Sequence, residues 1–338
     1  MPQQKQTHLE IITLAKDLGI NVKNDPFTEI IEFCERKIVS IISEMDECES
    51  LSDLLDCVTQ KANTKFIEIH NIDDIRNTAN EYISRQEKAF ANLENELSGE
   101  VYGITYRLQN PEEWENQYVS IIDCRDSKSA RAYFTKWHEI AHLLTLTEQT
   151  RLVFRRTPHT SINGGVPEER LMDAIAGKIG FCGAIFHKHI ENEISFEEIE
   201  RLRQLLCNEA SQQASLINFV KNWSSACIHL TIELGLNKDE QAKSNQITFD
   251  FFDSPAEVLR VIRVSPNEIA RKQKFSLFEN MRVPENSVIQ KVFKENLEYT
   301  EAIEDLSWWK DKLEQPIKVK VRKIGDSIDA LIFPYSNL

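Results

Sequence analysis

Apolar residues recur along the first part of the chain with two different spacings. Between residues 8 and 62 they follow helical spacing and predict three amphipathic helices. Residues 73–93 repeat this spacing and predict one long helix. Alternating apolar positions instead predict three short strands, at residues 66–70, 101–107 and 118–123. This order favours an α+β fold in which a small three-stranded sheet packs against helices.

The stretch from residue 131 to residue 144 predicts a further helix. It is apolar nearly all round, and such a helix is buried. Asp126 and Ser127 stand just before it and are good N-cap residues. A buried helix that also carries ionisable side chains needs a partner for them, because burying such groups alone is costly.

Three polar residues interrupt this helix in the pattern H-E-x-x-H: His138, Glu139 and His142. Residues four apart share a helix face, so both imidazoles can converge on one Zn²⁺. Glu139 follows the first histidine, where its carboxylate can act as general base toward water at the metal. The alternative is a helix whose polar residues merely face a partner domain.

A catalytic zinc needs a third protein ligand and one open position. The segment that begins at Pro167 predicts a returning helix, with the proline in its first turn. On it, Glu169 and Asp173 lie four residues apart and share one face. We therefore expect Glu169 to bind the metal and Asp173 to accept a hydrogen bond from a ligand histidine, which fixes the orientation of that ring. Glu168 is the competing ligand, but no acidic residue follows it one turn later.

These residues resemble the pattern of the ImmA/IrrE metallopeptidases, zinc peptidases of the gluzincin type. That family usually reads R-x-x-F-T, then H-E-x-G-H and, further on, E-x-x-A-[ND]-x-F-A. The matching residues here are Arg131, Phe134, Thr135, His138, Glu139, His142, Leu143, Leu144, Glu169, Asp173, Ala174 and Ala176. Ala141, Met172 and Ile175 depart from the pattern, and each keeps a small or apolar residue. The match covers residues 64–186 well.

The resemblance implies a mostly helical, zincin-like domain with Zn²⁺ as its cofactor. It also implies a protein substrate, a helix-turn-helix transcriptional repressor, whose cleavage derepresses stress, mobile-element or anti-phage genes. In gluzincins an edge strand binds the substrate as an added strand. We expect residues 101–107 to do so here, with Tyr102, Ile104 and Tyr106 contacting the substrate. The alternative is a central strand with no free edge.

A polar connection runs from residue 145 to residue 166 and borders the expected cleft, because it joins the two metal-ligand segments. His159 lies in it and can donate a hydrogen bond to the oxyanion of a tetrahedral intermediate. Tyr102 and Tyr106 are the rival donors for this role.

Residues 195–235 return to helical spacing. In the resembling family this position often holds a degenerate helix-turn-helix-like module. Few basic residues are present here, so we interpret the segment as packing and not as a DNA-binding element. Beyond it, the pattern predicts a helix over 287–312 and a hairpin turn at Gly325. The strands expected there are residues 258–264, 275–283, 317–321 and 328–333.

These patterns divide the chain into four parts. We expect an N-terminal helical segment (1–63), a zinc metallopeptidase core (64–190), a helical module with a linker (191–247) and a C-terminal α/β domain (248–338). Larger members of the resembling family carry a sensor-like domain at their C-terminus, some of it GAF-like. The resemblance implies the same role for residues 248–338.

Composition narrows the setting in which the protein works. A formal net charge of −14 argues against direct nucleic-acid binding by the catalytic domain, because such a surface repels phosphate. No apolar run is long enough to span a bilayer, and the N-terminus lacks the apolar core of a signal peptide. Seven cysteines without a C-x-x-C pair fit reduced, mostly buried thiols. We therefore expect a cytoplasmic protein with no membrane partner.

The sequence thus predicts a cytoplasmic zinc endopeptidase. A non-cleaving regulatory protein that sequesters a partner with the same fold is the alternative from a different class. The complete His-Glu-His-Glu set argues against that alternative, because a binding protein has no need of Glu139.

Overall fold

The computed structural model describes residues 2–45, 47–97, 99–146, 153–156, 167–237, 240, 256–310 and 314–335. The chain forms two compact units. The first combines residues 1–189 with 201–215, and the second combines residues 190–200 with 216–338. The chain therefore passes between the units after residues 189, 200 and 215, and not at the expected boundary of residue 247.

Three helices open the first unit, as the apolar spacing predicted. They are α1 (Pro2–Asp17), α2 (Pro26–Glu44) and α3 (Leu51–Lys61). Asp25 caps α2 by accepting a hydrogen bond from the backbone N–H of Thr28. Ser50 and Asp53 form a capping box at the start of α3. Two of the helices thus begin where a side-chain oxygen replaces a missing backbone acceptor.

The sheet of the first unit has four strands in the order β1-β3-β2-β4. They are β1 (Thr64–Ile69), β2 (Gly103–Arg107), β3 (Tyr118–Asp123) and β4 (Val153–Arg156). β1 runs parallel to β3, and the other neighbours are antiparallel. The three expected strands are confirmed, and β4 adds a fourth from the segment that we predicted as a loop. Four residues are too few to show an alternating pattern in the sequence.

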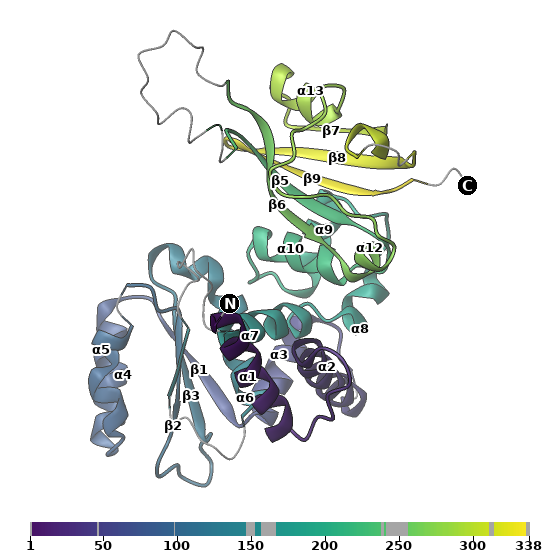
Figure 1. Ribbon diagram of the computed structural model, residues 1–338. Coiled ribbons are helices and arrows are strands. Elements are labelled where there is room, and N and C mark those ends of the chain that lie inside the picture. Colours follow the sequence, from purple (N-terminus) through teal and green to yellow (C-terminus); the bar gives the residue numbers. More distant parts are fainter. Residues whose placement is uncertain are drawn as a thin grey trace. The chain divides into compact units, whose positions relative to one another are not determined.

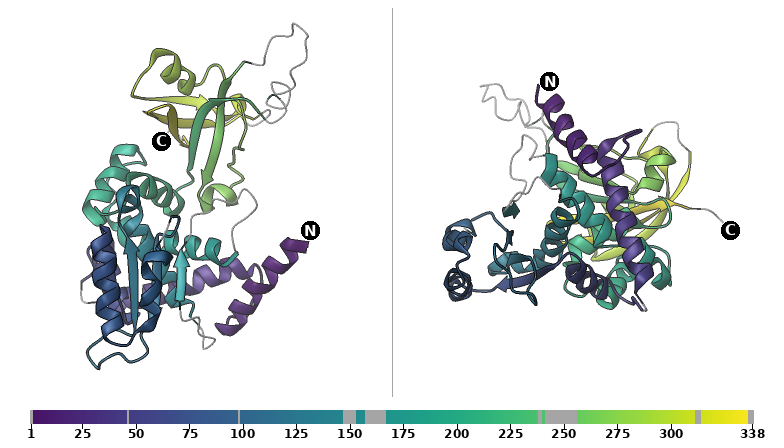
Figure 2. Two further views of the ribbon diagram at one scale, coloured as in Figure 1. Left: turned by 90° about the vertical axis from the view of Figure 1, so that its left-hand side faces the viewer. Right: turned by 90° about the horizontal axis from the view of Figure 1, so that it is seen from below.

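Each face of this sheet has a different cover (Figures 1 and 2). On one side, three short elements close a core that includes Ile104, Tyr106 and Val119. These elements are α4 (Ile72–Ser84), the 3₁₀ turn η1 (Lys88–Asn92) and α5 (Leu93–Glu96). On the other side lies α6 (Ala132–Leu144), the helix with the H-E-x-x-H residues. The strands therefore divide their alternate side chains between an apolar core and the candidate site.

One helix end and one helix cap in this unit differ from the prediction. The helix expected over residues 73–93 ends at Ser84, because Gln86 adopts a left-handed conformation (φ 68°). α6 begins as expected, but Asp126 and Ser127 do not cap it, since Asp126 has a positive φ of 50° and starts a 3₁₀ turn, η2 (Asp126–Arg131). The unit continues with α7 (Pro167–Ile179), α8 (Gly183–Phe186) and η3 (His187–His189). None of the described helices combines the length and the apolar character that a bilayer crossing requires.

The sheet of the second unit is antiparallel throughout, in the order β6-β5-β9-β8-β7. Its strands are β5 (Ile228–Gly235), β6 (Val258–Pro266), β7 (Tyr299–Asp305), β8 (Pro316–Ile324) and β9 (Ser327–Pro334). One face packs on an apolar core with α12 (Glu268–Lys272), α13 (Val288–Glu295) and η4 (Leu306–Trp308). α9 (Phe196–Leu206) and α10 (Gln212–Asn222) precede the sheet in the chain. The strands expected at 258–264, 317–321 and 328–333 are confirmed, as is the turn between the last two.

Three expectations for this half of the chain are wrong. Residues 228–235, expected at the end of a helix, form β5 and pair with both β6 and β9. Residues 275–283, all of them described, contain only an isolated bridge between Arg260 and Arg282. The helix expected over 287–312 ends at Glu295, because Asn296 adopts a left-handed conformation (φ 53°). Since β5 lies inside the sheet, residues 248–338 alone cannot make up the C-terminal domain.

Candidate metal centre

Two histidines of α6 face the same side of the helix. His138 and His142 are one turn apart, and their ring centroids are separated by 5.0 Å. Their side chains are buried, with exposed fractions of 1% and 3%. Helical spacing alone brings the two rings together, so this half of the site follows directly from the sequence pattern.

α7 brings a carboxylate to the two histidines. Glu169, in its first turn, places Oε2 3.2 Å from His138 Nε2 and Oε1 3.6 Å from His142 Nε2. One ligand atom from each of the three residues lies within 4.8 Å of the other two, so a single ion can reach them all. The predicted set is confirmed as a buried group that could hold a metal ion, and Glu168 is not part of it.

Asp173 contacts the far side of the first histidine. Its Oδ1 lies 2.8 Å from His138 Nδ1, the contact that its spacing from Glu169 predicted. An ionised carboxylate only accepts hydrogen bonds, so the ring carries a proton on Nδ1 and presents a lone pair on Nε2. That lone pair and the carboxylate of Glu169 converge on one buried point, where they suit a cation. The donor set therefore fits a divalent metal.

Close packing between α6 and α7 holds the two halves of the site together. A Cβ on Gly180, just after α7, would lie 2.7 Å from the ring of Trp137 and 2.8 Å from the carbonyl oxygen of Ala176. Tyr133 donates a hydrogen bond from its hydroxyl to the Gly180 carbonyl at 2.7 Å. Only glycine permits this approach, which fixes the end of α7 on α6 and thereby the position of Glu169.

Lys136 joins α6 to its surroundings within the first unit. Its Nζ lies 2.8 Å from Glu68 Oε1 on β1 and 3.1 Å from Glu209 Oε2. Burial by itself lowers the pKa of Lys136, but hydrogen bonds to the two carboxylates outweigh it and raise the pKa above its ordinary value. The charged ammonium is therefore favoured, and it fixes how α6 lies on the sheet.

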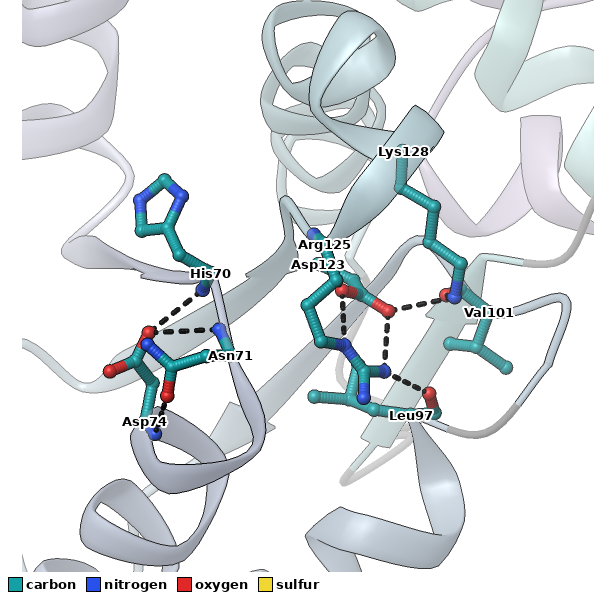
Figure 3. A network of polar contacts seen from close by, with 8 residues as sticks. All are labelled: His70, Asn71, Asp74, Leu97, Val101, Asp123, Arg125 and Lys128. Atoms are coloured by element: carbon teal, nitrogen blue, oxygen red, sulfur yellow. Dashed lines mark hydrogen bonds and ion pairs between the residues drawn. The ribbon is translucent and has the colours of Figure 1, made fainter.

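A buried carboxylate fixes the turn that leads into α6 (Figure 3). Asp123, at the end of β3, accepts hydrogen bonds from Arg125 Nε at 2.8 Å and Lys128 Nζ at 2.7 Å. The two cations also donate to the carbonyls of Leu97 and Val101, at 2.7 and 2.9 Å. Burial works to raise the pKa of Asp123, but the two cations outweigh it and hold the pKa below its usual range. This network ties the entrance of α6 to the segment that precedes β2.

The glutamate of the H-E-x-x-H pattern faces the sheet. Glu139 is fully buried, and Thr105 on β2 donates a hydrogen bond to its Oε2 at 2.7 Å. Gly103 makes room for it, because a Cβ there would lie 2.8 Å from Glu139 Oε1 and 2.7 Å from Thr135 Cγ2. Sequence reasoning missed both Gly103 and Thr105. The signal that could have found them is the alternation of β2, which places them on the face opposite to its apolar residues.

The strand expected to bind substrate, β2, is a central strand of the sheet and not an edge strand. β2 pairs with β3 on one side and β4 on the other. The expectation that residues 101–107 have a free edge is therefore wrong. Ile104 and Tyr106 have exposed fractions of 0% and 1% and belong to the core under α4. The Tyr106 hydroxyl donates a hydrogen bond to Glu96 on that same side. Neither residue can contact a substrate, and Tyr106 is no longer a candidate for the oxyanion donor.

Two predicted residues remain. Tyr102 is half-buried, and its ring lies under the Arg131 guanidinium at 4.8 Å and the Lys128 ammonium at 5.7 Å. This places it beside the turn into α6, and its part in catalysis stays a prediction. His159 lies outside the described residues, so its role as oxyanion donor also stays a prediction.

No protein-family model matches this chain, and no curated protein is significantly similar to it. The family resemblance of the metal-site residues therefore stays a prediction. What the protein does has to be inferred from the chemistry of the site.

Proposed function

We propose that this protein is a cytoplasmic zinc-dependent endopeptidase. The observation that carries the proposal is the buried group of His138, His142 and Glu169, with Glu139 next to His138 on α6. Two imidazoles and one carboxylate leave one position open around a four-coordinate ion, an arrangement typical of catalytic zinc. Structural zinc sites use four protein ligands and are closed.

The residues of the chain have separate tasks in this proposal. Bound zinc would polarise the scissile carbonyl and acidify a water molecule next to it. Glu139 takes a proton from the attacking water and passes it to the leaving amine, so the C–N bond breaks and the carboxylate is regenerated. Asp173 holds the His138 ring in the orientation that a ligand needs.

An extended peptide suits the sheet beside the site. Within the described part of the chain, β4 pairs with β2 alone, so it has an outer edge of backbone groups. We assign to β4 the strand-addition role predicted for β2, because its N–H and C=O groups can pair with a substrate backbone. The resemblance of the sequence points to a helix-turn-helix repressor of stress, mobile-element or anti-phage genes as the substrate.

The test uses purified full-length protein loaded with zinc and incubated with helix-turn-helix repressors encoded beside it, with mass spectrometry of the products. Glu139→Gln should keep the metal but cleave at least about 10²- to 10⁴-fold more slowly, since an amide cannot take the proton. The exposed Glu94→Gln on α5 is the matched control and should cleave normally.

Two outcomes would contradict the proposal. Near-normal cleavage by Glu139→Gln would remove that residue from the mechanism. Zinc-dependent binding of a repressor without fragments would favour the alternative, a regulatory protein that sequesters its partner.

A further inference from the structure

A row of three hydroxyl groups crosses the sheet of the first unit and ends on Glu139. Thr64 Oγ1 on β1 lies 3.2 Å from Ser120 Oγ on β3, which lies 2.6 Å from Thr105 Oγ1 on β2. Thr105 Oγ1 in turn lies 2.7 Å from Glu139 Oε2. All three hydroxyl residues are buried, with exposed fractions of 2% or less.

The strand register makes this row a property of the sheet. Thr105 and Ser120 are directly opposite each other in the antiparallel pairing of β2 with β3. Residues in that relation point to the same face and lie close enough for their side chains to touch. Threonine is also stiff at χ1, so the backbone positions its hydroxyl and leaves it little freedom to turn away.

The chemistry of the groups fixes the direction of the hydrogen bonds. Thr105 is the donor in its contact with Glu139, and an ionised carboxylate only accepts hydrogen bonds. Thr105 donates its single proton to Glu139, so it must accept the proton of Ser120, and Ser120 must accept from Thr64. Hydrogen bonds that run in one direction through a dry interior polarise and strengthen one another.

We propose that Thr105, supported by Ser120, is a positioning residue for the general base. Its hydroxyl holds one oxygen of Glu139 against β2, and Gly103 provides the space for the other. The carboxylate is thereby kept in a single orientation relative to the neighbouring ligand His138. The catalytic consequence of this arrangement rests on the proposed peptidase function, whereas the hydrogen-bonded row does not.

The first test compares two substitutions that separate hydrogen bonding from packing. Thr105→Val keeps the shape and loses the hydroxyl, while Thr105→Ser keeps the hydroxyl and loses a methyl group. With a quenched fluorescent peptide that the zinc-loaded protein cleaves, kcat should fall about 10- to 100-fold for the valine variant. KM and zinc content should stay at wild-type values, and the serine variant should recover most of kcat.

Packing alone predicts the reverse order, because valine fills the site and serine leaves a gap. A serine variant slower than the valine variant would therefore overturn the proposal. Ser120→Ala should lower kcat in the same direction but by less, since it removes support and not the contact itself. The control is Thr78→Val, the same substitution at a buried position of α4 on the other side of the sheet, which should leave kcat unchanged.

The second test needs no activity. Thr105→Val is made in the wild-type chain and in a Glu139→Leu chain, and the thermal midpoint of each is measured. The valine substitution should lower the midpoint in the wild-type background and leave it unchanged or higher with Glu139→Leu, where the hydroxyl has lost its acceptor. An equal fall of the thermal midpoint in both backgrounds would contradict the proposed role of the Thr105 hydroxyl, even if the protein is an active peptidase. Coupling between Thr105 and Glu139 in a protein that cleaves nothing would support the hydrogen-bonded row. It would contradict the catalytic role of the row together with the proposed function.

Discussion

In the described part of each unit a buried histidine contacts an aspartate, yet one of these two pairs belongs to a group that could hold a metal ion and the other does not. In the first unit, His138 Nδ1 lies 2.8 Å from Asp173 Oδ1. In the second unit, His229 Nε2 lies 2.9 Å from Asp329 Oδ1. Both histidines are almost fully buried. Judged by the pair alone, the two sites are equivalent.

The difference lies in what surrounds each pair. Beyond His138 lie a second histidine and a carboxylate, so lone pairs converge on one point. Beyond His229 the aspartate meets a cation instead, because Arg322 approaches Asp329 Oδ2 to 3.6 Å. Among the described residues, only the first unit has a group of three ligands. An aspartate–histidine pair therefore does not indicate a metal unless further donors converge on the other ring nitrogen.

Two buried cations of the second unit are also paired with carboxylates of the chain. Lys320 lies 2.9 Å from Glu193, and Arg260 lies 2.8 Å from Glu240. Each of these cations meets a carboxylate, so the charges compensate one another and require no added ion. The comparison predicts that substitutions in the two units will have different effects, on metal content in one and on stability in the other.

The largest difference is expected between the two histidines. His142→Ala should reduce zinc from one ion per chain to nearly none, because two protein ligands rarely hold zinc. His229→Ala, the matched substitution in the second unit, should keep the full metal content. Elemental analysis after gel filtration measures both. Equal metal content in the two variants would show that the site is not where we infer it to be.

The two aspartates should differ by a smaller factor. Asp173→Asn should weaken zinc binding or peptidase activity by about 10- to 100-fold, the usual cost of losing a residue that orients a ligand. Asp329→Asn should leave zinc affinity unchanged. Competition with a chromophoric chelator gives both affinities, and a loss of affinity in Asp329→Asn would remove the distinction between the pairs.

The aspartate of the second unit should matter for stability, although it should not matter for zinc binding. Asp329→Asn leaves Arg322 beside a neutral amide and should lower the free energy of unfolding of the second unit by about 1–3 kcal/mol. Glu285→Gln breaks only an exposed ion pair with Lys294 and should cost about 0–1 kcal/mol. Urea titration followed by tryptophan fluorescence measures both, and similar losses would mean that burial of the pair has no energetic consequence.

The last predicted effect is a dependence of stability on pH, and it concerns a buried aspartate that meets cations and no histidine. Because the pKa of Asp123 is depressed in the folded state, its contribution to stability is present above the unfolded-state pKa of about 3.9. That contribution disappears as the pH falls through the lower folded-state pKa. Asp123→Asn should therefore be less stable than wild type at pH 7, and the gap should narrow below about pH 4. If the difference in stability between Asp123→Asn and wild type does not change with pH, the loss of stability comes from packing and not from charge.

Much of the site could be predicted because its residues lie on helices. His138 with His142 and Glu169 with Asp173 are both four residues apart, so spacing alone assigns them to one face. The contacts that support them cross between elements and leave no local signal. Lys136 meets Glu68 and Glu209, which are far from it in the sequence.

In the sheets, spacing was less informative. The alternation of β2 identified a strand but not which of its faces meets the site. Ile104 and Tyr106 were therefore predicted to contact the substrate, whereas Gly103 and Thr105 are the residues that face the site. β5 was merged with the preceding helical pattern, because its alternation begins soon after α10 ends. The hairpin of β8 and β9 was predicted, since its short turn interrupts two clear alternations. The GAF-like identity expected for the C-terminal part stays a prediction.

The place of β9 has a consequence for how a growing chain folds on the ribosome. β9 is the last strand of its sheet along the chain, yet it lies between β5 and β8. β5 pairs first with β6 on one edge, and the partner for its other edge lies about 100 residues further on, as the contact between His229 and Asp329 illustrates. All three residues of the candidate metal site have been synthesised by residue 169. During the interval, one edge of β5 stays unpaired on the nascent chain and can pair wrongly with other strands.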